Sequence, residues 1–156
     1  MRREGYYEKK EHDPDYKYDS VKVTRFINYL MRRGKKSLAE NIFYNSMDYI
    51  EEQLNEDPLE VFEKAISNAS PKMEVVSRRI GGANYQIPRK VRPERKFFLA
   101  AQWIIEAARS GEGSPIYKRL AEEIISAYNY EGSAINRKES VQKMAEANKA
   151  FAGFLN

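Results

Sequence analysis

The chain has 156 residues with no cysteine and one histidine, His12, and it carries 27 Lys and Arg against 23 Asp and Glu, a net charge of +4. Without cysteine it can hold no disulfide, thiolate nucleophile or cysteine-ligated metal, and one histidine cannot form a multi-histidine metal site. Its most apolar stretch, residues 97–105, is far shorter than the ~20 residues that cross a membrane. We therefore expect a single domain over residues 1–156 and no membrane partner. We also expect a cytoplasmic location, because the N-terminus runs into charge rather than an apolar signal core.

Charge is segregated along the chain. Residues 1–36 carry eleven basic and six acidic side chains, and residues 37–70 carry one and eight. Residues 71–96 carry eight and two, and residues 97–156 carry seven of each. An acidic block between two basic blocks predicts a molecule with one cationic face, which attracts polyanions. The alternative is that the charges are spread evenly over a solvated surface.

Three helices are predicted before residue 71, after an extended N-terminal tail over residues 1–19. They cover about 20–33, 37–54 and 57–69, where apolar residues recur at helical spacing. Each range begins with a helix start signal: Ser20, Ser37 with Glu40 as a capping box, and Asp57 followed by Pro58. Gly34 is expected to end the first helix.

The pattern changes between Pro71 and Pro93. β-Branched residues on both sides of Gly81 and Gly82 predict a β-hairpin over about residues 72–91, because glycine adopts the positive φ that a tight turn requires. The hairpin has few large apolar residues of its own. We therefore expect a basic arm that protrudes from the helical body.

Three more helices are predicted after the hairpin, over about residues 93–110, 115–128 and 134–152. The first of them has a wide apolar band and is expected at the centre of the core. The sequence thus predicts a mainly α fold, with about six helices and a protruding basic β-hairpin between the third and the fourth.

No group of residues predicts an enzyme. The carboxylates of residues 51–63 are typical of a solvated helix face, and His12 stands in a polar stretch. The segment 111–114 lacks the lysine of a phosphate-binding loop. We expect no catalytic residue, metal, cofactor or small-molecule substrate.

Basic residues accompanied by glycine and an aromatic residue predict nucleic-acid binding. Guanidinium groups bind phosphate, Tyr85 offers a ring for stacking, and Gly81 and Gly82 permit a close backbone approach. The alternative for the hairpin's paired basic residues is protection of an edge strand from aggregation. The residues expected to bind RNA are Arg2, Arg3, Lys22, Arg25, Lys35, Lys36, Arg78, Arg79, Gly81, Gly82, Arg92, Arg95 and Lys96.

Six segments, in their order and spacing, carry a family resemblance. They are RFINYLM at 25–31, GKKS at 34–37, PLEVF at 58–62, SRRIGGANYQIP at 77–88, VRPER at 91–95 and MAEANKAFA at 144–152. With them the whole chain resembles the bacterial-type small-subunit ribosomal protein seven family. The resemblance implies a helical domain with a β-ribbon that binds the 3′ major domain of small-subunit (16S) rRNA directly and nucleates assembly of the subunit's head.

The resemblance also implies further neighbours in the ribosome. It implies a position near the exit-site tRNA and the mRNA path, and contacts with small-subunit ribosomal proteins nine and eleven. The residues expected on the side of the exit-site tRNA are Tyr85, Arg137, Lys138, Lys143 and Lys149.

Two other functions fit the same residues. An architectural DNA-binding protein could combine a helical body with a basic β-arm, although the hairpin tip has no apolar wedge for unstacking bases. A helical protein–protein adaptor could use the acidic second and third helices as its partner surface.

Overall fold

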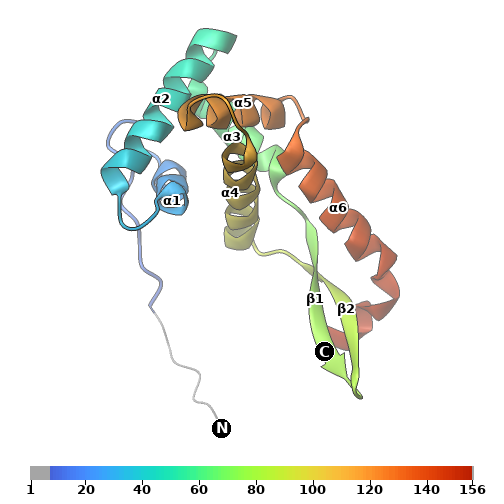
Figure 1. Ribbon diagram of the computed structural model, residues 1–156. Coiled ribbons are helices and arrows are strands. Elements are labelled where there is room, and N and C mark those ends of the chain that lie inside the picture. The colour runs from blue at the N-terminus through green and yellow to red at the C-terminus, as the bar shows by residue number, and fades with distance from the viewer. Residues whose placement is uncertain (1–7, 156) are drawn as a thin grey trace.

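This computed structural model describes residues 8–155. Within them the chain forms six α-helices, one 3₁₀-helix and a two-stranded antiparallel hairpin (Figure 1). The elements are α1 (Val21–Leu30), α2 (Lys36–Leu54), α3 (Pro58–Ala69), β1 (Met73–Ile80), β2 (Ala83–Lys90), α4 (Pro93–Ser110), α5 (Ile116–Tyr128), α6 (Ser133–Ala147) and the 3₁₀-helix η1 (Lys149–Leu155). The predicted mainly helical fold with a hairpin between the third and fourth helices is confirmed.

The hydrophobic core lies among α1 to α5 and the start of α6. Phe26, Phe43 and Phe62 are fully buried, and their ring centroids lie 5.1–5.5 Å apart. Helix α4 packs against α1, α3, α5 and α6, and it buries a band that includes Ala101 and Ile104. Its predicted place at the centre of the core is confirmed.

The first helix begins as predicted but ends earlier. The Ser20 hydroxyl accepts a hydrogen bond from the backbone N–H of Val23. The predicted end at Arg33 is wrong, because Met31 already has extended backbone angles and closes the helix with its N–H on the carbonyl of Ile27. Arg33 and Gly34 then have positive φ values of 54° and 71°, so the chain turns sharply there.

The predicted capping box at Ser37 is also wrong. Lys35 is the N-cap of α2 and makes no side-chain capping bond, and its carbonyl accepts the first helical hydrogen bond, from Ala39. The preceding turn sets this start, because the N–H of Lys36 donates to the carbonyl of Gly34 at 2.9 Å. Ser37 therefore lies inside the first turn of the helix.

The predicted helix over residues 134–152 is two elements, so its expected continuity is wrong. Helix α6 ends at Ala147, and the side-chain amide of the C-cap residue Asn148 donates to the carbonyl of Met144 at 2.7 Å. The chain then turns into η1, which packs against β2. This turn brings Phe151 and Phe154 onto the hairpin, where both rings contact Tyr85.

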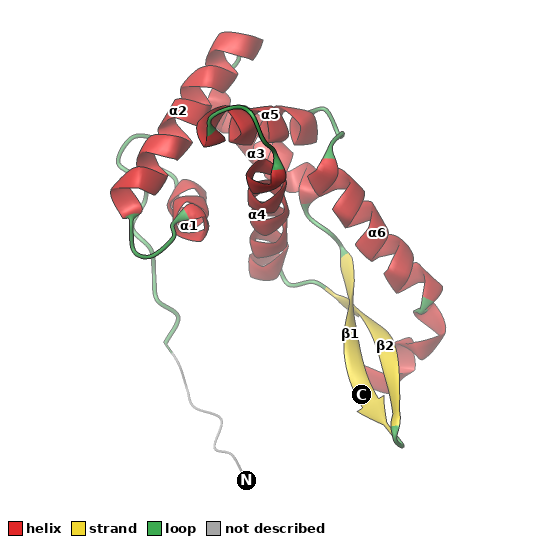
Figure 2. Cartoon of the chain, in the orientation of Figure 1, coloured by secondary structure: helices red, strands yellow, loops and turns green. Residues whose placement is uncertain are grey.

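The hairpin extends from the helical body, and the C-terminal part of α6 lies beside the part of the hairpin that is nearer the body (Figure 2). Its register pairs Met73 with Lys90 and Ile80 with Ala83, around a turn in which Gly81 and Gly82 have φ of 57° and 86°. The half near the body is partly buried, and the tip is exposed. The predicted arm is confirmed, but α6 and η1 accompany it.

Hydrogen bonds to α1 and α2 hold the N-terminal segment against the body from Asp13 onward. The carbonyl of Asp13 accepts a hydrogen bond from the Thr24 hydroxyl at 2.8 Å. Asp15 is buried, and its carboxylate accepts hydrogen bonds from the Tyr44 hydroxyl and from the backbone N–H of Tyr18. These bonds hold the chain just before α1 against α2.

Candidate nucleic-acid interface

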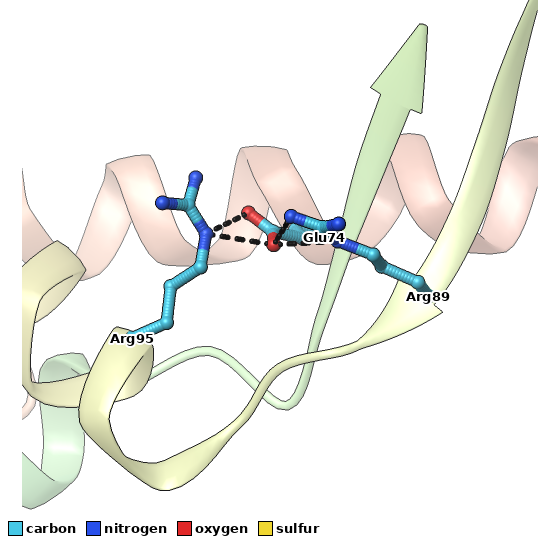
Figure 3. A network of polar contacts seen from close by, with 3 residues as sticks. All are labelled: Glu74, Arg89 and Arg95. Atoms are coloured by element: carbon cyan, nitrogen blue, oxygen red, sulfur yellow. Dashed lines mark hydrogen bonds and ion pairs between the residues drawn. The ribbon is translucent and has the colours of Figure 1, made fainter. Parts of the chain in front are cut away.

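Two arginines converge on one buried carboxylate at the base of the hairpin (Figure 3). The side chain of Glu74, on β1, is 9% exposed. Arg89, its cross-strand neighbour, donates from Nε to Oε1 at 2.9 Å, and its Nη2 lies 2.8 Å from the same oxygen. Arg95, in the first turn of α4, donates from Nε to Oε1 at 2.8 Å and to Oε2 at 3.0 Å. Glu74 therefore ties both strands of the hairpin to α4.

The two arginines keep the Glu74 carboxylate ionised. Burial by itself raises the pKa of this carboxyl, but the hydrogen bonds and positive charges of Arg95 and Arg89 outweigh burial and hold its pKa below the usual range. Figure 3 shows the terminal nitrogens of Arg95 directed away from the carboxylate. Those nitrogens can therefore donate to another acceptor.

A third arginine reaches the same region from α1. Nη2 of Arg25 donates to the Tyr29 hydroxyl at 3.3 Å, and its guanidinium lies 4.8 Å from the centre of the Phe97 ring. Arg25 lines one pocket together with Arg92 and Arg95. Three arginines thus line one hollow together with a single carboxylate residue, Glu94, and this excess of positive charge suits phosphate oxygens.

Two further basic residues, which the sequence analysis missed, lie beside this region. Nζ of Lys9 lies 2.9 Å from Glu94 on α4, and Lys9 and Lys10 line a pocket together with Arg25. Both belong to the basic block of residues 1–36, but no local motif connects them with α4. Only this long-range contact shows where they lie.

The turn between α1 and α2 forms a second basic group. One pocket beside it is lined by five basic side chains, which are Arg32, Arg33, Lys35, Arg109 and Arg119. Burial lowers the pKa of Arg109, and the charge of Arg32 lowers it further. Nη2 of Arg109 donates to the carbonyl of Leu30 at 2.7 Å, so this arginine holds the end of α1. Lys36 lines a different pocket, with residues of the N-terminal segment.

The hairpin tip carries the predicted Arg78, Arg79, Gly81 and Gly82. Both arginines are exposed, and Nη1 of Arg78 donates to the carbonyl of Phe154 at 3.1 Å. A Cβ placed on either glycine would meet no atom within 4 Å, so the turn is open to a partner. The tip therefore presents charge and accessible backbone together.

The residues predicted on the side of the exit-site tRNA differ in their surroundings. The ring of Tyr85 packs 5.4 Å from Phe151, so one face of it is already covered. Nζ of Lys138 donates to the carbonyl of Asn68 at 2.7 Å, which connects α6 with the end of α3. The others are exposed on α6 and just beyond it: they are Arg137, Lys143 and Lys149.

Two of the remaining predicted RNA-binding residues, Lys22 and Lys96, line neither of these basic pockets. Nζ of Lys22 lies 3.9 Å from Glu63 on α3, and Lys96 is half-buried on α4. Arg2 and Arg3 lie outside the described residues.

Two kinds of feature are missing from the described part of the chain. Among residues 8–155, no group of three or more His, Asp or Glu side chains could hold a metal ion. Within the same residues, every helix is too short or too polar to cross a membrane.

Comparison with known proteins places the chain in a family. The sequence profile of the family described as ribosomal protein S7p/S5e matches residues 2–149. The chain is 50% identical to the small ribosomal subunit protein uS7 of Chloroflexus aggregans, and the alignment covers 99% of this chain and 98% of that protein. It is also 50% identical to uS7 of Natranaerobius thermophilus and 49% identical to uS7 of Roseiflexus castenholzii, again over 99% of this chain and over 99% and 98% of those proteins.

The described residues form a helical body with a basic hairpin, and the chain matches ribosomal proteins over nearly its whole length. The chain belongs to the ribosomal protein S7p/S5e family. This family consists of structural proteins rather than enzymes, and the prediction that the chain is not an enzyme is confirmed.

Proposed function

We propose that this protein is a primary rRNA-binding protein of the small ribosomal subunit, which binds the 3′ major domain of 16S rRNA and nucleates assembly of the head. Family membership and the uS7 relatives support the broader role of a structural component of the small subunit, in the cytoplasm. The convergence of Arg25, Arg92 and Arg95 on one pocket carries the proposal for RNA.

Phosphate is the ligand that this surface suits best. Lys9 and Lys10 lie beside Arg25, so basic side chains from the N-terminal segment, α1 and the start of α4 share one region. Neutralising several phosphates at once releases counterions and supplies affinity, and the shape of a folded RNA supplies selectivity. The exposed hairpin tip extends this charged surface away from the body.

A position near the exit-site tRNA and the mRNA path, and contacts with ribosomal proteins nine and eleven, are part of the same proposal. Helix α6 runs beside the hairpin and exposes Arg137 and Lys143. An elongated extension with basic side chains on two elements is suited to lie between RNAs. The family resemblance supports these neighbours.

Titration of the purified protein against a 3′ major domain fragment, across a range of salt and with duplex DNA as competitor, tests the proposal. We expect binding that resists the competitor, with log affinity falling by about 0.7–0.9 per neutralised phosphate for each unit of log salt. Equal binding to both nucleic acids would support an architectural DNA-binding protein. A salt-independent protein complex without nucleic acid would support the adaptor.

The double variant Arg78→Ala with Arg79→Ala tests the tip. Both side chains are exposed, so we expect weaker RNA binding and a salt slope flatter by about 0.7–0.9 for each phosphate that is no longer neutralised. The bond of Arg78 to the Phe154 carbonyl lies outside the helical body, so the thermal unfolding temperature of that body should be nearly unchanged. Lys64→Ala with Lys118→Ala removes the same charge from α3 and α5 and serves as the control. If the tip variant loses cooperative unfolding, its arginines are structural.

A further inference from the structure

Glu74 is a carboxylate in the most basic part of the chain. It is one of two buried carboxylates in the described part of the chain, and residues 71–96 around it carry eight basic side chains. Next to a surface that binds phosphate, a negative charge lowers affinity for any polyanion. Because Glu74 is buried and bonded to two arginines, its effect is on the placement of those arginines.

The two arginines are held by Glu74 in different ways. Arg89 directs both Nε and Nη2 at Oε1, so its hydrogen-bonding edge is directed at the carboxylate. Arg95 uses only Nε, and its terminal nitrogens point away from Glu74 (Figure 3). Arg95 also lines the pocket that it shares with Arg25 and Arg92. The Glu74 carboxylate thus accepts the hydrogen bonds of one edge of Arg89, and it orients Arg95 while leaving the terminal nitrogens of Arg95 directed elsewhere.

We propose that Glu74 is a positioning residue that determines the selectivity of this surface for folded RNA; this inference rests on the proposed RNA-binding function. Glu74 withdraws Arg89 from phosphate binding and holds the fork of Arg95, together with the base of the hairpin, in one orientation. Non-specific affinity depends on how many phosphates are neutralised, whereas selectivity depends on where the contacts are placed. The carboxylate therefore lowers affinity for any duplex and raises the preference for an RNA of matching shape.

The variant Glu74→Gln, compared with Glu52→Gln, tests this role. Both changes remove one negative charge, but Glu52 is exposed on α2, a helix that packs against α1, α3 and α5 rather than against the hairpin or α4. We expect Glu74→Gln to bind duplex DNA more tightly, with a salt slope steeper by about 0.9 for one additional neutralised phosphate. Its preference for the 3′ major domain fragment should fall roughly tenfold, the effect of removing one oriented, charge-assisted hydrogen bond.

The control separates charge from positioning. Glu52→Gln should leave the ratio of the affinities for RNA and duplex DNA unchanged. If Glu74→Gln keeps the wild-type ratio, the inference is overturned while the proposed function stands. If the wild-type protein binds both nucleic acids equally, the proposed function fails and the inference fails with it.

A second pair of variants tests the inference without removing the buried carboxylate. Arg95→Lys keeps the charge beside Glu74 but removes the planar guanidinium group. Arg89→Lys makes the same change at the arginine whose hydrogen-bonding edge is directed at Glu74. We expect Arg95→Lys to lose several-fold in RNA preference and Arg89→Lys to retain it. Equal loss in both variants, with unchanged thermal unfolding, would overturn the assignment.

Discussion

Basic residues of the same type have different roles because their neighbours differ. Arg119 donates to the carbonyls of Ala108 and Ser114 and so joins α5 to the end of α4. Arg79, which has a similar sequence environment of basic and apolar residues, is exposed at the hairpin tip. A guanidinium directed at backbone carbonyls stabilises the fold, whereas an exposed one is available to phosphate.

Glu74 should also make stability depend on pH. The pKa of this carboxyl lies below its ordinary value of 4.5 in the folded protein, because Arg95 and Arg89 outweigh the effect of burial. A lowered folded-state pKa stabilises the protein above the unfolded-state value, and this stabilisation is lost as the pH falls through the folded-state value. We expect Glu74→Gln to be less stable than wild type at pH 7, with the difference shrinking below about pH 4.5.

Thermal unfolding followed by circular dichroism between about pH 7 and pH 3 measures this effect. Glu52→Gln, at an exposed carboxylate of α2, is the control and should follow the wild-type curve. A stability difference between Glu74→Gln and wild type that stays constant over the whole range would contradict the prediction.

At the scale of the elements, the hairpin depends on the C-terminal helices. A two-stranded hairpin by itself is marginally stable in water and needs a packing partner. Helix α6 packs against β1 and η1 against β2, and Tyr85 forms an aromatic cluster with Phe151 and Phe154 whose centroids lie 5.4–5.9 Å apart. The orientation of the hairpin tip is therefore coupled to the end of the chain.

Removing one ring from this cluster should loosen the hairpin alone. We expect Phe151→Ala to speed amide hydrogen exchange in β2, by an amount corresponding to about 0.5–1.5 kcal/mol for the removed aromatic pair. The thermal unfolding temperature of the helical body should change little. Gly153→Ala, in the same segment with open space around its Cβ, is the matched control. Unchanged exchange in Phe151→Ala would show that η1 does not support the hairpin.

For the whole molecule, the hydrophobic core and the exposed basic side chains reside in different parts. The helical body contains the aromatic core around Phe43, whose ring contacts those of Phe26, Phe62 and Tyr18. The charged surface lies on the hairpin, its base and the N-terminal segment. When a rigid body carries exposed basic segments, folding stability can change without a change in binding, and binding can change without a change in stability.

Phe43→Ala should therefore destabilise the protein without a change in RNA selectivity. Its side chain is fully buried, so we expect a loss of about 3–5 kcal/mol in the free energy of unfolding, measured by urea denaturation. At a temperature where the variant remains folded, the ratio of RNA to duplex affinity should match wild type. Leu38→Ala, at a side chain that is 55% exposed on the same helix, should have a small effect. Wild-type stability in Phe43→Ala would show that this cluster is not the core.

Features set by neighbouring residues were predictable from the sequence. Ser20 and Asp57 cap their helices because each side chain reaches a backbone N–H two or three residues away. Gly81 and Gly82 mark the hairpin turn because both need positive φ. The predicted capping box at Ser37 was wrong because the turn at Gly34 moves the start of the helix to Lys36. The residue pattern of a capping box does not show that a neighbouring turn can set the helix start instead.

The order and type of the elements up to α6, the absence of cysteine chemistry and the segregation of charge all follow from the chain read along its length. The pairing of Arg95 and Arg89 with Glu74, the hollow shared by Arg25 and Arg92, and the packing of η1 on the hairpin depend on contacts between distant segments. Such contacts depend on how helices pack, and packing is decided by the shapes and volumes of many buried side chains together. Which basic side chains come together on the surface was therefore decided by tertiary packing rather than by any local pattern.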